Sequence, residues 1–83
     1  MTNLDHINSL RSHGAQIKAE DTLIDLTAAF YEKAVEACRN GGFTAVTYDL
    51  VLPGIEEPMM LVVWKDGHVD SGTTRRIIEC LDR

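Results

Sequence analysis

The sequence lacks the features of a membrane protein and of a disulfide-stapled or zinc-binding domain. No apolar run approaches the roughly 20 residues that a membrane-spanning helix needs. Met1 to His6 contain neither the basic nor the apolar segment of a secretion signal. Cys38 and Cys80 lie far apart and form no Cys-x-x-Cys motif. We therefore expect a cytoplasmic protein without membrane contact, in which both cysteines pack in the core.

Patterns of catalytic and metal-binding residues are missing as well. His6 and His13 are seven residues apart, so on one helix they lie about 10 Å apart along its axis, too far for one metal ion. Neither cysteine lies in a motif that would place a base beside its thiol. We expect a protein that is not an enzyme and that binds neither a metal ion nor a cofactor.

Basic residues are outnumbered, because eight Lys and Arg face thirteen Asp and Glu, which gives a net charge of −5. This charge disfavours direct binding of nucleic acid and favours a basic partner. The 83 residues suffice for one domain, 1–83, and their 45% hydrophobic share indicates a folded chain. The apolar residues exceed what a domain of this size can easily bury, so we expect a homodimer.

Helical patterns occur in three places. Apolar residues recur at helical spacing over 3–13, which predicts a first helix. Thr22 is a suitable cap for a second helix over 22–40, which Asn40-Gly41-Gly42 ends. A last helix is predicted over 73–81.

Strand patterns fill the remaining part of the chain. Apolar residues alternate with others over 43–52, and 59–65 is almost continuously apolar, as in a buried strand. Asp66-Gly67 is a strong hairpin signal and predicts a short third strand over 68–70. The predicted fold is α+β, with two N-terminal helices, a three-stranded antiparallel sheet and a C-terminal helix, in the order ααβββα.

From the second predicted helix onward, the order αβββα resembles that of the double-stranded RNA-binding domain. In that family, basic residues at the start of the last helix bind phosphates. The resemblance implies that Arg75 and Arg76, which follow Gly72-Thr73-Thr74, bind RNA or another polyanion. Against this, exposed acidic residues on the long helix would repel phosphate.

Acidic and apolar residues predict a protein-binding surface instead. Asp25, Glu32 and Glu36 would share one side of the long helix, and Ile55 would lie at the tip of a loop bracketed by prolines. Each has an alternative, namely a solvated helix face for the acids and core packing for the apolar residues. The predicted partner-binding residues are Asp25, Glu32, Glu36, Ile55, Glu56, Glu57, Met59, Arg75 and Arg76.

These patterns lead to two hypotheses of function. The first is a small acidic binding protein that inhibits or modulates a larger, basic complex that handles nucleic acid. Small acidic proteins of phages and mobile elements that block host defence are similar in size and charge. The alternative is an RNA-binding or polyanion-binding module that uses Arg75 and Arg76.

Overall fold

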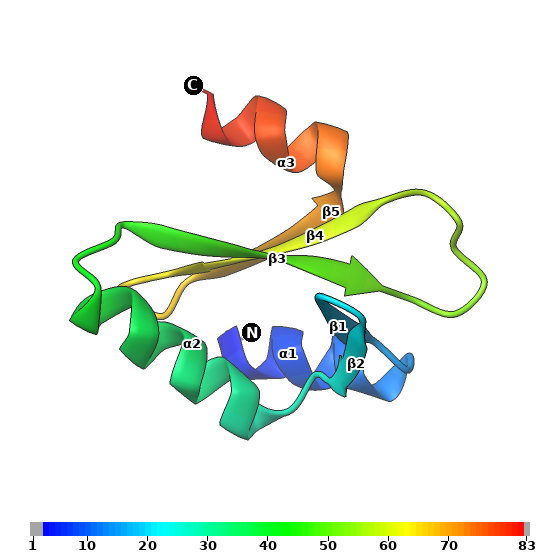
Figure 1. The fold of residues 1–83 in the computed structure, drawn as a ribbon, viewed down its shortest axis with the longest axis horizontal. Coiled ribbons are helices and arrows are strands. Elements are labelled where there is room, and N and C mark those ends of the chain that lie inside the picture. The colour runs from blue at the N-terminus through cyan, green and yellow to red at the C-terminus, as the bar shows by residue number, and fades with distance from the viewer. Residues whose placement is uncertain (1–2, 83) are drawn as a thin grey trace.

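The computed structural model describes residues 3–82, which form one five-stranded antiparallel sheet with helices on both of its faces (Figure 1). The strands follow one another across the sheet in the order β2-β1-β3-β4-β5. The α+β class is confirmed, whereas the three-stranded sheet and the order ααβββα are wrong. The elements are α1 (Asn3–Ser12), β1 (Gln16–Ala19), β2 (Thr22–Asp25), α2 (Ala28–Asn40), β3 (Ala45–Val51), β4 (Met59–Trp64), β5 (Val69–Thr73) and α3 (Thr74–Leu81).

The main correction concerns the segment around Thr22, which is strand and not helix. The chain reverses at the turn that follows β1, where Glu20 adopts a φ of 55°, and β2 returns along β1. The long helix begins only after Thr27, whose hydroxyl oxygen accepts a 3.1 Å hydrogen bond from the Phe30 N–H. The β-branched Ile24 suits a strand, and it pairs directly with the buried Ile17.

One face of the sheet carries the main core. Alternate side chains of the strands point to this face, and α1 and α2 cover it (Figure 1). Ile7 of α1 and Leu26, just before α2, are fully buried there. The cluster of buried residues consists of Ile7, Ala15, Ile17, Leu26, Ala34, Val35, Leu50, Leu61, Val63 and Val69.

The opposite face is covered only in part. α3 lies on this side and packs on β4 and β5, where Ile77 of the helix and Val62 of the sheet are buried (Figure 1). The side chains of β1, β2 and β3 that point to this side are mostly exposed to solvent. We call this region the open face, and its exposed residues are Lys18, Leu23, Asp25, Thr47, Asp49 and Val51.

The hairpin between β4 and β5 is confirmed, although β5 is longer than the predicted strand over 68–70. Gly67, with a φ of 90°, donates its N–H to the Trp64 carbonyl and closes the turn. α2 holds this turn in place, because the Tyr31 hydroxyl donates to the Gly67 carbonyl at 2.5 Å and Arg39 Nε donates to the Lys65 carbonyl at 2.7 Å. Among the helices within residues 3–82, none is long and apolar enough to cross a membrane.

Candidate functional site

A groove lies between β3 and the loop that connects it to β4. Its volume is about 340 Å³, and it includes four of the predicted partner-binding residues. We call it the acidic groove. Its lining consists of Lys18, Asp49, Leu50, Val51, Ile55, Glu56, Glu57, Pro58 and Met59.

The loop above the acidic groove is shaped by its own main chain. The Ile55 N–H donates to the Leu52 carbonyl at 3.2 Å, and Gly54 adopts a φ of 79°, which favours glycine. At the other end, the Pro58 carbonyl accepts a 2.9 Å hydrogen bond from the Thr74 N–H at the start of α3. The loop is thus anchored at both ends, and Ile55 at its tip stays 46% exposed.

The electrostatics of the groove are dominated by three carboxylates. Asp49, Glu56 and Glu57 are exposed, and Lys18 is the basic residue among the lining residues. Lys18 is the register partner of Asp49, yet no ion pair joins them or any groove carboxylate within the described residues. The groove therefore offers negative charge next to apolar surface, which suits the cationic head and apolar stem of a lysine or arginine.

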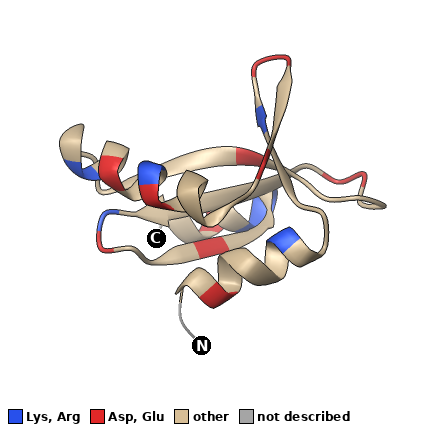
Figure 2. Cartoon of the chain, turned by 90° about the horizontal axis from the view of Figure 1, so that it is seen from below, with Lys and Arg blue, Asp and Glu red and all other residues tan. Residues whose placement is uncertain are grey.

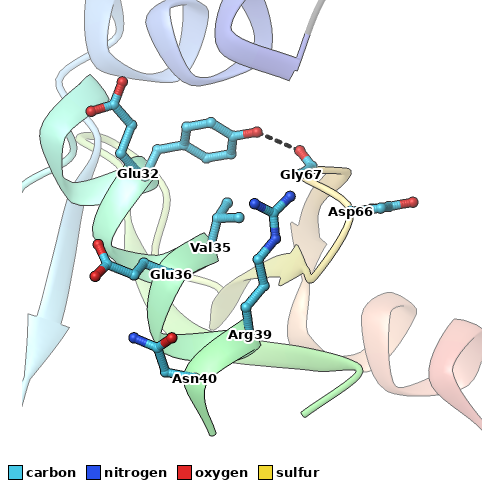
Figure 3. Close-up of a pocket in the computed structure, with 8 residues that line it drawn as sticks. Glu32, Val35, Glu36, Arg39, Asn40, Asp66 and Gly67 are labelled. Carbon is cyan, nitrogen blue, oxygen red and sulfur yellow. Dashed lines mark hydrogen bonds between the residues drawn. The ribbon is translucent and has the colours of Figure 1, made fainter. Parts of the chain in front are cut away.

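The remaining predicted acids lie elsewhere. Asp25 is on β2 and not on the long helix, and its carboxylate accepts a 3.0 Å hydrogen bond from Gln16 Nε2. Glu32 and Glu36 lie on α2, along a second hollow of about 490 Å³ into which Arg39 reaches toward the β4–β5 turn (Figure 3). The single acidic stripe expected on one helix is therefore divided between a hairpin and a helix.

The two arginines of α3 have different surroundings. Arg76 Nη2 lies 3.2 Å from a carboxylate oxygen of Asp70 and also donates to the Ser71 carbonyl. Its guanidinium lies over Gly72, where it fills the space that a side chain would need. The side chain of Arg75 is 90% exposed and lies 3.5 Å from the Glu79 carboxylate one turn on. Of the predicted pair, Arg76 is therefore engaged in contacts within the domain, whereas Arg75 is solvated.

The cysteines and histidines are dispersed. Cys38 is fully buried and its thiol donates to the Phe43 carbonyl, as a core residue would, but Cys80 is exposed, contrary to expectation. His6 Nε2 lies 2.8 Å from the Ser71 hydroxyl, and the ring of His68 lies against Trp64. Within residues 3–82, no cluster of three or more His, Cys, Asp or Glu could hold a metal ion.

The sequence predicted the loop side of the groove and Met59 of β4, but not the residues that β1 and β3 contribute. Ile55, Glu56 and Glu57 were predicted because they follow one another on one loop. Lys18 and Asp49 were missed, since they meet only through the pairing of β1 with β3. The alternation within 43–52 gave the one available signal, because it placed Asp49 on the face opposite the buried Leu50.

A comparison of this chain with protein families, with curated proteins and with solved structures finds no match. The role of the acidic groove therefore has to follow from its own geometry and charge.

Proposed function

We propose that this chain is a non-enzymatic protein-binding domain whose acidic groove docks on a basic surface of a larger protein. The observation that carries the proposal is the groove itself, in which three carboxylates without ion-pair partners adjoin the exposed side chains of Val51 and Ile55. Exposed carboxylates alone are common on protein surfaces. Their concentration around a hollow with an apolar wall is the feature that favours binding.

The physical basis of binding combines two terms. An arginine or lysine of the partner would place its cationic group near Glu56 or Glu57 while its methylenes cover Ile55. Each exposed ion pair contributes only about 0–1 kcal/mol, so affinity depends on several such pairs and on burial of the apolar wall. The charges also accelerate association, and this contribution decreases as salt is added.

The proposed partner is a protein that handles nucleic acid, because such proteins present basic surfaces to phosphate. A small acidic domain that occupies such a surface competes with the nucleic acid and acts as an inhibitor or modulator. Small acidic proteins of phages and mobile elements that block host defence are similar to this chain in size and charge. The expected consequence is that the bound partner loses affinity for its nucleic acid.

The test compares two charge-reversed proteins. The partner is captured from the cells that encode this chain, purified, and titrated with wild type and with the double variant Glu56→Lys/Glu57→Lys. We expect the dissociation constant to rise at least about tenfold, equal to 1.4 kcal/mol. The matched control is Glu32→Lys/Glu36→Lys, which changes the same charge on α2 and leaves the groove intact. Equal losses from both pairs would contradict a role for the groove, and no loss from either would contradict the proposed function.

Binding of RNA or another polyanion has less support. Arg76 is occupied by Asp70 and the Ser71 carbonyl, so Arg75 is the solvated cation of the predicted pair. Salt-dependent binding of duplex RNA that Arg75→Glu abolishes would restore this alternative.

The homodimer also stays a prediction. Exposed apolar residues, among them Leu4, Phe43 and Ile78, are available to a second copy. Light scattering at tens of micromolar protein decides the question, because a strict monomer would contradict the dimer without affecting the acidic groove.

A further inference from the structure

β2 forms one edge of the sheet, and its outward main-chain groups can be assigned. The Leu26 N–H donates to the Ala15 carbonyl at 3.3 Å, which makes these residues a hydrogen-bonded pair of the β1–β2 ladder. Such pairs alternate along antiparallel strands. The main-chain groups of Ile24 therefore face β1, whereas the N–H and C=O groups of Leu23 and Asp25 face away from the sheet.

At the other edge, β5, side chains take up the outward main-chain groups of the middle residue, Ser71. The Trp64 N–H donates to the His68 carbonyl, so the same alternation turns the main-chain groups of Ser71 outward. Asp70 Oδ1 accepts the Ser71 N–H at 2.8 Å, and Arg76 donates to the Ser71 carbonyl. A further strand could not pair along the whole of β5 without displacing these contacts of Asp70 and Arg76. β2 is thus the edge of the sheet that can accept one.

The side chains and charges at β2 indicate what kind of strand fits. Leu23 is 51% exposed and Ile24 40% exposed, and they offer one apolar contact on each face of the hairpin. Glu20 and Asp21 at the turn and Asp25 at the end of β2 are exposed acids (Figure 2). The hairpin projects from the body of the domain, with these acids at its tip and its base (Figure 2). An extended segment with basic and apolar side chains complements this edge.

A second copy of this chain fits the edge poorly. Antiparallel pairing of two β2 strands about Leu23 would set Asp21 opposite Asp25 of the other copy, and pairing about Asp25 would set the two aspartates opposite each other. Like charges directly opposite each other destabilise a strand pair. Basic side chains in a partner strand convert the same positions into attractive pairs.

We propose that an extended basic segment of the partner protein adds to the sheet as a sixth strand along β2. This inference rests on the proposed function, since it assigns the partner a contact beside the acidic groove. The outward groups of Leu23 and Asp25 supply the main-chain hydrogen bonds, and the acids of the hairpin select lysine and arginine. The open face continues from β2 across β1 and β3 to the groove, so one partner can reach both.

The first test uses a defined probe, a short capped peptide in which lysine alternates with valine. Titration into the isotope-labelled protein is expected to shift the amide signals of Leu23 and Asp25 and to slow their hydrogen exchange, with smaller effects at Ile24. The same peptide, N-methylated at alternate residues to remove the donors that would face β2, keeps its charge and is expected to bind at least about tenfold more weakly. Equal binding of both peptides, or shifts confined to Glu56 and Glu57, would overturn strand addition.

The second test uses variants of the chain. Leu23→Pro removes an outward N–H and no ladder bond to β1, so the hairpin should form while the edge is blocked. Asp25→Lys leaves the strand pattern in place and reverses the charge, with Glu79→Lys on α3 as its matched control. We expect both β2 variants to bind the lysine–valine peptide and the purified partner more weakly than wild type does. The control variant should bind both with the affinity of wild type.

The outcomes separate the two proposals. If Glu56→Lys/Glu57→Lys abolishes partner binding while Leu23→Pro and Asp25→Lys leave it unchanged, strand addition fails and the proposed function stands. If none of these variants affects the partner, both fail. Self-association of the wild type that Leu23→Pro abolishes would assign the edge to a second copy and overturn the inference.

Discussion

The two edges of the sheet are built in opposite ways. At β5, Arg76 and Asp70 take up the outward main-chain groups of Ser71, and Gly72 leaves the space in which the guanidinium lies. At β2, the outward groups of Leu23 and Asp25 face solvent on a hairpin that projects from the domain (Figure 2). Proteins commonly protect their sheet edges against unwanted pairing. The contrast between the two edges is the reason for proposing that a strand of the partner adds to β2 and not to β5.

The comparison also explains residues that looked functional in the sequence. Arg76 resembled one member of a phosphate-binding pair of arginines, but it contacts Asp70 and the Ser71 carbonyl at the β5 edge. Leu23 resembled a core residue of a helix, yet it is half exposed on an edge strand. The charge or polarity of each residue was evident from the sequence, whereas its contacts depended on the position of its strand in the sheet.

The largest expected effect comes from removing the anchor of the protected edge. Ile77 is 1% exposed and holds α3, and with it Arg76, on β4 and β5. Ile77→Ala should lower the free energy of unfolding by about 2–4 kcal/mol, because a large aliphatic side chain leaves a cavity in the core. Urea denaturation measures this change. The control Ile78→Ala removes an exposed side chain of the same helix and should change it by less than about 0.5 kcal/mol; equal losses would mean that α3 is not anchored as described.

A smaller effect is expected from removing the Arg76 side chain, which occupies the β5 edge. Arg76→Ala should reduce the free energy of unfolding by about 1 kcal/mol, because the ion pair with Asp70 is half exposed and the Ser71 carbonyl returns to water. The variant should also self-associate at high concentration through the opened β5 edge, which sedimentation detects. Arg75→Ala is the control. An Arg76→Ala protein with the association state of wild type would show that the ion pair is not what closes this edge.

The turn of the open hairpin offers a stabilising change. Glu20 adopts a φ of 55°, a conformation that costs a residue with a Cβ roughly 1–2 kcal/mol and costs glycine almost nothing. Glu20→Gly should therefore raise the free energy of unfolding by about 0.5–1 kcal/mol, measured by urea denaturation. Destabilisation instead would mean that the side chain of Glu20 supports the hairpin.

The smallest effect concerns β3, between the two edges, and depends on pH. Burial, with a smaller contribution from Cys38, raises the pKa of the Tyr48 phenol above its ordinary value of 10.0. The folded state therefore favours the neutral phenol, and the stability that this contributes is full below pH 10 and is lost as the pH rises through the pKa in the folded protein. Ultraviolet titration should show this raised pKa of Tyr48 in wild type. The same pKa is expected in Arg76→Ala and in Leu23→Pro. A shift in either variant would mean that the edges are coupled to the middle of the sheet.

The sequence determined the parts of this protein that depend on local patterns. Alternation over 43–52, the apolar run from Met59 and the Asp66-Gly67 turn predicted β3, β4 and the hairpin to β5. Ile55, Glu56 and Glu57 could be placed together because they are neighbours on one loop. These features need no contact with distant parts of the chain, so side-chain period and turn chemistry suffice.

Only the tertiary structure decided the β1–β2 hairpin and the roles of both edges. The turn of this hairpin contains no glycine, and Thr22 to Asp25 fit a capped helix start as well as a strand. Pairing of Ile17 with Leu50 therefore decides between helix and strand. The same pairing brought Lys18 and Asp49 into the acidic groove. Strand pairing joins residues far apart in sequence, and it is this non-local pairing that places β2 at an open edge and β5 at an edge occupied at Ser71.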